Sequence, residues 1–192
     1  GEAKKALAYQ AYEKYKEEHF MLDFDDLLLK TVELFEKFPE ILQKWQHKFQ
    51  YIHVDEFQDV GNIDYKLIYM LSKQSLLCVV GDPDQTIYSF RGSDVNYIMN
   101  FDKDYPHVKT VILDQNYRST KTILDISNNL IRKNKNRLEK DLFTELEDGD
   151  KVVHYSALDE ESEAEFVCQT IEDIIHHVEG VNYHDFAILY RA

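Results

Sequence analysis

Cysteine is scarce in this 192-residue sequence, and its two copies, Cys78 and Cys168, lie far apart in apolar surroundings. This spacing suggests neither a CxxC metal pair nor a disulfide framework, and it favours a reduced, cytoplasmic protein. Long apolar runs are also missing, because no stretch approaches the ~20 residues that a membrane-spanning helix needs. The first residues, Gly1 to Lys5, have no apolar segment behind their charges. Secretion and membrane insertion are therefore both disfavoured.

Positive charge is the second shortage. The chain has 22 Lys and Arg against 36 Asp and Glu, a net charge of −14. Because phosphate binding draws its affinity from Lys and Arg, this balance argues against non-specific wrapping of nucleic acid, and any nucleic-acid site must be local. The rest of the composition is typical of a soluble globular protein, because 44% of the residues are hydrophobic and 13 Tyr and 11 Phe argue against disorder. The length allows one domain or two small ones.

Hydrophobic periodicity predicts helices first and then an alternation of strands and helices. The first helices cover residues 8–15, 24–38 and 40–48, with Asp23 as the N-cap of the second. The alternation that follows indicates βαβ units and a parallel sheet buried on both faces, hence an α/β fold. Its predicted strands are 51–54, 76–80, 111–113, 152–155 and 186–190, and its predicted helices are 62–72, 94–101, 120–131 and 160–177. Residues 132–150 form a predicted loop, and a change in charge near residue 119 predicts a domain boundary there.

Polar segments follow three of the predicted strands. They read Asp55-Glu56-Phe57-Gln58-Asp59, Gly81-Asp82-Pro83-Asp84-Gln85-Thr86 and Asp114-Gln115-Asn116-Tyr117-Arg118-Ser119. Ligands bind outside the carboxyl ends of strands in open parallel sheets, so we expect these side chains to gather at one edge. Asp55 is placed to hold Mg²⁺, which prefers one or two carboxylates plus water and phosphates, and Glu56 could accept a proton from an attacking water. The alternative is that Asp55, Glu56 and Asp59 merely cap the next helix.

The other two segments also allow two interpretations each. Gln85 can orient a water or donate to a phosphate oxygen, while the residues around it are turn formers, and both can hold together. Arg118 offers a planar fork for phosphate and Tyr117 an aromatic face for a base; alternatively, the pair is structural.

A third group, Tyr88, Phe90 and Arg91, places two aromatic rings at alternate positions beside an arginine. Bases of single-stranded nucleic acid stack on such rings, at ~1 to 3 kcal/mol each, while arginine contacts the backbone. The alternative interpretation is a core strand.

Taken together, residues 51–59, 80–92 and 113–119 resemble helicase motifs two, three and four of the UvrD/PcrA/Rep family, with the PcrA branch nearest. The order and spacing agree, and residues 23–28 and 186–191 also resemble that family, so the likeness covers nearly the whole chain. It implies a RecA-like motor core of the P-loop NTPase type, with a parallel sheet and flanking helices, here incomplete. Residues 1–20 would be a helix entering from an inserted subdomain, 21–118 the later part of the first motor domain, and 119–192 the start of the second.

The same resemblance implies a role for each motif residue. Asp55 would bind Mg²⁺, Glu56 would activate the hydrolytic water and Gln85 would sense the γ-phosphate of ATP. Tyr117 would stack on adenine, and Arg118 would stabilise charge on the transferring phosphoryl group. Single-stranded DNA would contact Tyr88, Phe90 and Arg91. Phe90 stands where the family usually has Trp, and Pro83 also departs from the commoner residue.

The resemblance also implies what the chain lacks. None of the six glycines belongs to a GxxxxGK[S/T] phosphate loop. We therefore expect a fragment of an ATP-dependent DNA helicase that couples ATP hydrolysis to 3′ to 5′ movement on single-stranded DNA and to unwinding at duplex junctions, in repair or replication, and we expect the fragment alone to be inactive. Two alternatives stay open: a metal-dependent nuclease or phosphotransferase, or a non-catalytic acidic interaction module. The former would use Asp55, Asp59, Asp82 and Asp84 as a two-metal cluster.

Overall fold

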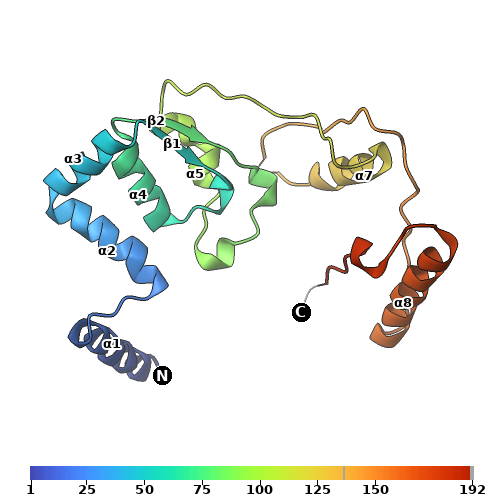
Figure 1. Cartoon of the computed structure of the whole chain (residues 1–192), viewed down its shortest axis with the longest axis horizontal. Helices are drawn as coiled ribbons and strands as arrows, with labels where there is room; N and C mark the ends of the chain where they lie inside the picture. The colour runs from blue at the N-terminus through green and yellow to red at the C-terminus, as the bar shows by residue number, and fades with distance from the viewer. Residues whose placement is uncertain (136, 191–192) are drawn as a thin grey trace. The chain divides into compact units, whose positions relative to one another are not determined.

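A computed structural model describes residues 1–135 and 137–190 (Figure 1). The chain divides into two compact units, which are described separately. The first comprises Gly1–Asn116 with Ile126–Phe143, and the second comprises Tyr117–Asp125 with Thr144–Ala192. Asn136 of the basic stretch and Arg191 of the last motif lie outside the described residues.

The first unit opens with the three predicted helices, α1 (Glu2–Glu18), α2 (Phe24–Lys37) and α3 (Pro39–Lys48). Asp23 is the N-cap of α2, as predicted, and its Oδ1 accepts a hydrogen bond from the Asp26 N–H at 2.9 Å. Pro39 begins α3, where its missing N–H costs nothing. Helices α2, α3 and α4 (Asn62–Ser72) pack against one another.

A buried lysine fastens α1 to the start of α2. Lys16 Nζ lies 2.7 Å from Asp26 Oδ2 and 2.9 Å from Asp23 Oδ2, and 2.8 Å from Glu13 on its own helix. Burial by itself lowers the pKa of Lys16, but the hydrogen bonds to these carboxylates outweigh it and raise the pKa above its ordinary value. The same contacts hold the pKa values of Asp23 and Asp26 below their ordinary range.

The predicted βαβ unit is present. Strands β1 (Tyr51–Val54) and β2 (Leu76–Val79) pair in parallel, with Tyr51 opposite Leu76, and α4 connects them. Alternate strand side chains, among them Val54 and Val79, pack against the core of the unit. That core is built on Phe57, Val60 and Phe101.

The prediction that both faces of the sheet are buried is wrong for this pair of strands. Tyr51 and Leu76, on the other face, are 64% and 68% exposed. The side chains alternate strictly in burial along both strands, as in a sheet covered on one face only.

The predicted helix over 94–101 is divided in two, α5 (Asn96–Met99) and α6 (Phe101–Asp104). The break falls at Asn100, whose side-chain amide donates to the Asn96 carbonyl at 3.1 Å, the same oxygen that accepts the Asn100 N–H. Asparagine side chains compete in this way with the backbone bonds of a helix, which explains why the periodicity continues although the helix does not.

The remaining helices match their predictions: α7 spans Lys121–Ile131 and α8 spans Glu160–His177, with Asp159 as the N-cap of α8. The strands predicted at 111–113, 152–155 and 186–190 are not formed among the described residues. A strand exists only through its hydrogen bonds to a neighbour. Near residue 113 the pairing is limited to a single bridge between Gln115 and Phe143, and Leu113 is 77% exposed.

Within the described residues, no helix combines the length and the apolar character needed to cross a membrane. Both cysteines, Cys78 and Cys168, are free thiols and exposed.

Candidate functional site

The loops that follow β1 and β2 are joined to each other. The Phe57 N–H donates to the Val80 carbonyl at 2.9 Å. Next to this bond, the Gln58 side chain, 1% exposed, links the two loops a second time. Its Oε1 accepts from the Asp82 N–H at 3.0 Å, and its Nε2 donates to Glu56 Oε2 at 2.7 Å. The structure thus brings the first two of the three predicted loops together.

Gly81 makes this junction possible. A Cβ at this position would lie 2.7 Å from Gln58 Oε1 and 3.1 Å from the Gln58 backbone nitrogen. Cβ atoms essentially never lie within 3.0 Å of another heavy atom, so a larger residue at position 81 would push the Gln58 side chain out of its present place and crowd the Gln58 backbone.

Asp55 and Glu56 lie at the carboxyl end of β1, and both are exposed. Glu56 has φ 49° and ψ 41°, the left-handed region, which costs a non-glycine residue roughly 1–2 kcal/mol. Its N–H donates to Asp55 Oδ1 at 2.9 Å. Strained backbone of this kind recurs where a side chain must be aimed at a ligand.

The helix-capping alternative for these acids is wrong. Glu56 makes no side-chain cap bond, and α4 begins after Gly61, whose N–H donates to Asp64 Oδ2 at 3.1 Å. The acids of the first loop are therefore not used to start the next helix.

The second loop is organised by Asp82. Its Oδ2 accepts from Gln85 Nε2 at 3.0 Å, and its Oδ1 accepts from Lys140 Nζ at 2.6 Å. Burial raises the pKa of the Asp82 carboxyl, but the hydrogen bonds from Lys140, Gln85 and the Asp84 N–H outweigh it, and the net shift is downward. The predicted turn is present as a 3₁₀ helix, Pro83–Gln85, so the turn and an exposed Gln85 coexist.

Tyr88, Phe90 and Arg91 form an exposed cluster and not a core strand. Residues Ser89–Arg91 make a 3₁₀ turn, and Phe90 is 76% exposed. The Tyr88 and Phe90 ring centres lie 6.1 Å apart, and the Arg91 guanidinium lies 5.3 Å from the first ring and 5.5 Å from the second. Two exposed rings beside a cation form a surface on which flat, anionic ligands can stack.

Tyr117 and Arg118 belong to the second compact unit, while Asp55 and Gln85 belong to the first. Tyr117 is 79% exposed. That Tyr117 and Arg118 of the third loop join the first two loops at one edge stays a prediction.

The chemistry of the first loop suits a magnesium nucleotide. Among the described residues, no group of three or more His, Cys, Asp or Glu side chains could hold a metal ion by itself. Mg²⁺ bound to a nucleotide does not need such a group, because it takes one or two carboxylates and completes its shell with phosphate and water. Asp55, exposed at a strand end with Oδ1 fixed by a backbone N–H, fits that requirement.

Sequence reasoning missed two sets of residues at this site. Gln58 lies inside a segment singled out for its acids, and nothing in its residue type distinguishes it from the other amides nearby. Arg137 and Lys140, which contact Asp84 and Asp82, lie in the predicted loop that follows α7. Their charge was visible in the sequence, but their partners were not.

Comparison with known proteins identifies the family. Residues 2–106 match the model of the UvrD/REP helicase N-terminal domain, and residues 111–192 match that of the UvrD-like helicase C-terminal domain. The chain therefore belongs to the UvrD/REP helicase family, as its motifs indicate.

Particular relatives are named ATP-dependent DNA helicase PcrA. The chain is 49% identical over 188 residues to PcrA from Staphylococcus aureus and 47% identical to PcrA from Staphylococcus epidermidis. The match covers 97% of this chain but 26% of the length of each relative.

Proposed function

We propose that this chain is part of an ATP-dependent DNA helicase, in which it supplies the water-activating side of the ATP site and a contact for single-stranded DNA. The observation that carries the proposal is the junction of the first two loops, where buried Gln58 connects Glu56 to the loop of Gln85. The relatives named PcrA support the same function, because the similarity runs through both loops.

In this proposal Asp55 holds Mg²⁺, which when bound neutralises charge on the nucleotide phosphates. Glu56 accepts a proton from the attacking water, and Gln85 contacts the γ-phosphate. Tyr117 stacks on adenine and Arg118 stabilises the transferring phosphoryl group. The phosphate loop is absent from the 192 residues, so the cradle for the phosphates must come from elsewhere in a longer protein.

The proposal extends to the architecture of that longer protein. Residues 21–118 belong to the first RecA-like motor domain and 119–192 to the second, with 1–20 entering from an inserted subdomain. The protein acts in the cytoplasm on single-stranded DNA and duplex junctions, moving 3′ to 5′.

The exposed cluster of Tyr88, Phe90 and Arg91 is the proposed DNA contact. It follows the Gln85 turn directly in the chain, so a shift of that turn on ATP hydrolysis moves the surface on which bases stack. Phe90 offers a smaller ring than the Trp usual in the family, which weakens stacking without removing it.

The nuclease alternative gains no support from the acids it requires. Asp82 is paired with Lys140 and Asp84 with Arg137, so two of its four proposed metal ligands are already neutralised by cations.

The substitution Glu56→Gln in the full-length protein tests the proposal. The variant should bind ATP normally but lose roughly 10²- to 10⁴-fold in the DNA-stimulated rate of hydrolysis, because an amide cannot accept the proton. Fluorescent-nucleotide binding and phosphate release measure the two properties, with Glu17→Gln on α1 as the matched control. A hydrolysis rate within tenfold of the parent would remove Glu56 from the mechanism and the proposal with it.

A further inference from the structure

The segment that follows α7 returns to the loop that carries Gln85. Lys140 Nζ lies 2.6 Å from Asp82 Oδ1, and Arg137 Nε lies 3.3 Å from Asp84 Oδ2. The Arg137 and Asp84 side chains are each only 9% exposed, so this ion pair is buried. Arg137 and Lys140 thus contact two acids of the Gln85 loop, Asp84 and Asp82.

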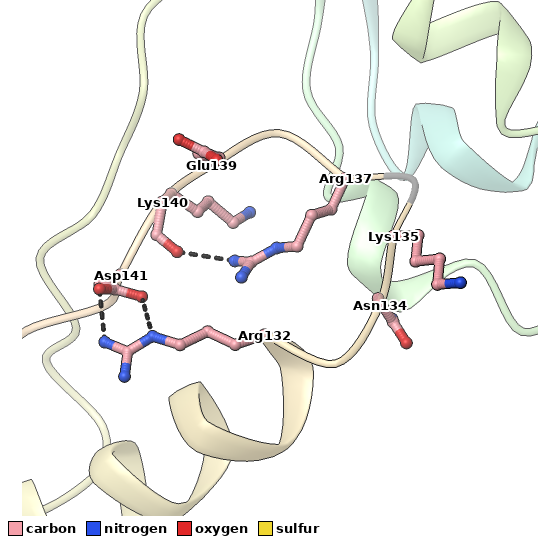
Figure 2. A pocket seen from close by; sticks show the side chains of 7 residues that line it. All are labelled: Arg132, Asn134, Lys135, Arg137, Glu139, Lys140 and Asp141. Atoms are coloured by element: carbon pink, nitrogen blue, oxygen red, sulfur yellow. Dashed lines mark hydrogen bonds and ion pairs between the residues drawn. The ribbon is translucent and has the colours of Figure 1, made fainter.

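The segment of residues 137–142, called the strap below, is held firmly at its other end. Both polar atoms of the Asn128 side chain in α7 bond to the backbone of Leu142, Nδ2 to the carbonyl at 2.8 Å and Oδ1 to the N–H at 3.2 Å. Arg132, just past the end of α7, holds Asp141 by two hydrogen bonds, at 2.6 and 3.1 Å (Figure 2). The strap is therefore fixed to α7 at one end and to the Gln85 loop at the other.

The positive side chains of the strap have partners within the chain. They border a hollow of about 540 Å³, and Figure 2 shows the Arg137 guanidinium donating to the Lys140 carbonyl, a bond of 2.7 Å. Because Arg132, Arg137 and Lys140 all face a carboxylate of the protein, the hollow is poorly suited to capture an anion. The cations are used to join two parts of the chain.

Asp82 connects the strap to Gln85. One carboxylate oxygen takes the Lys140 ammonium and the other takes the Gln85 amide, so Gln85 and Lys140 share a single rigid group. The Lys140 and Asp82 side chains are 16% and 23% exposed, so removal of the ammonium leaves a partly buried carboxylate without its cation, and the carboxylate then moves or takes another donor. A shift of Asp82 therefore changes the position of the carboxylate oxygen to which the Gln85 amide donates.

We propose that the strap sets the position of Gln85, and that Lys140 and Arg137 are positioning residues for ATP hydrolysis that act through Asp82 and Asp84. This inference rests on the proposed function of Gln85. The proposed architecture places residues beyond 119 in the second motor domain and Gln85 in the first. Lys140 and Arg137 would then allow the second motor domain to influence the position of Gln85. Because the strap is bonded to α7, a movement of α7 would change the position of Gln85 through the strap.

The test uses Lys140→Met in the full-length helicase. We expect kcat for DNA-stimulated ATP hydrolysis to fall roughly ten- to a hundredfold, as a misplaced catalytic group would cause, while KM for ATP stays within about twofold. Lys140→Arg should restore most of the rate, because it returns a cation to Asp82. Lys135→Met, which removes a positive charge from the same hollow, is the matched control and should leave the rate unchanged.

A second comparison shows whether the effect passes through Gln85. In a Gln85→Ala background, Lys140→Met should have no further effect on kcat, since the group that it positions is already gone. If the two losses multiply, or if kcat is unchanged in Lys140→Met, the strap does not position Gln85. Equal losses in Lys140→Met and Lys135→Met would overturn the proposal in favour of an anion site in the hollow.

Thermal melts show whether each variant is folded. If Lys140→Met does not fold, Lys140→Gln, which keeps a donor but no charge, takes its place in the same comparisons. The Glu56→Gln variant separates the two proposals. If Glu56→Gln is inactive in ATP hydrolysis while the Lys140 variant is fully active, only the proposal about the strap is wrong. If Glu56→Gln is active, the proposed function is wrong.

Discussion

At the scale of single residues, Gln58 is a polar side chain with almost no exposure. Each end of its amide serves a different loop, the oxygen facing Asp82 and the nitrogen facing Glu56. A buried amide is stable only when both ends are satisfied, so the two loops must keep their present spacing for Gln58 to remain inside.

Gly81→Ala should therefore destabilise the first unit. The new methyl group would lie 2.7 Å from Gln58 Oε1 and 3.0 Å from Ile98 Cδ1, and overpacking of this kind costs about 1–3 kcal/mol. Urea denaturation followed by the fluorescence of Trp45, the single tryptophan, reports on this unit. In a Gln58→Ala background part of the cost should be recovered, and strict additivity of the two changes would show that the contact is not its cause.

The residues at this scale differ in how far the sequence reveals them. Asp55, Glu56 and Gln85 are predicted as site residues because polar side chains directly after apolar strands lie at the edge where ligands bind. The burial of Gln58 could not be predicted, because it depends on how closely a second loop approaches. The ion pair of Lys140 with Asp82 joins residues 58 positions apart, and a list of charges does not say which of them meet.

At the scale of elements, the joint between α1 and α2 depends on one charge cluster. Lys16 is 7% exposed and faces two carboxylates of the neighbouring segment. Because the pKa values of Asp23 and Asp26 are lowered in the folded state, their contribution to stability is present above the ordinary value of 3.8 and is lost as the pH falls through the lowered values.

Lys16→Met should loosen this joint and remove its dependence on acid. We expect the melting temperature at pH 7 to fall on the order of 5 °C, because two acids lose their common partner. Between pH 4.5 and 2.5 the parent should lose more stability than the variant, as followed by far-ultraviolet circular dichroism. Lys14→Met is the control, since Lys14 pairs with Glu18 at 3.6 Å in an exposed position. Equal effects of the two substitutions would contradict the role given to Lys16.

Helices were predicted more accurately than strands, for a physical reason. The hydrogen bonds of α4 and α8 lie within each segment, so the periodicity of the sequence is enough to define them. Residues 111–113 and 152–155 have the apolar character of strands, but their bonds require a neighbour that the pattern does not name. The break at Asn100 shows a third case, in which a single side chain interrupts a helix whose periodicity continues.

At the scale of the whole molecule, the chain matches both helicase domain models and spans about a quarter of the length of the relatives named PcrA. The match to the first domain model ends at residue 106 and the match to the second begins at residue 111, while the 188-residue match to PcrA covers 26% of that relative. Under the proposed function, hydrolysis of ATP needs more of the protein than these 192 residues.

We accordingly expect the 192-residue chain to show no hydrolysis of ATP above background, with or without single-stranded DNA. Without a phosphate loop, the backbone amides and lysine that cradle the β- and γ-phosphates are missing. Phosphate release in the presence of Mg²⁺ measures the rate, and the Glu56→Gln variant of the same chain, purified in parallel, reveals contamination. Turnover that the parent shows and this variant lacks would prove the expectation wrong.

The exposed face and the edges of the β1–β2 pair affect how the chain behaves on its own in solution. Among the described residues, β1 and β2 form a sheet of two strands, so each strand has one edge that pairs with no further strand, and Tyr51 and Leu76 add an exposed apolar surface beside these edges. Such an edge is a template for any extended peptide, including another copy of the same chain. Self-association should therefore rise with protein concentration, and the fraction of monomer should be highest in dilute samples.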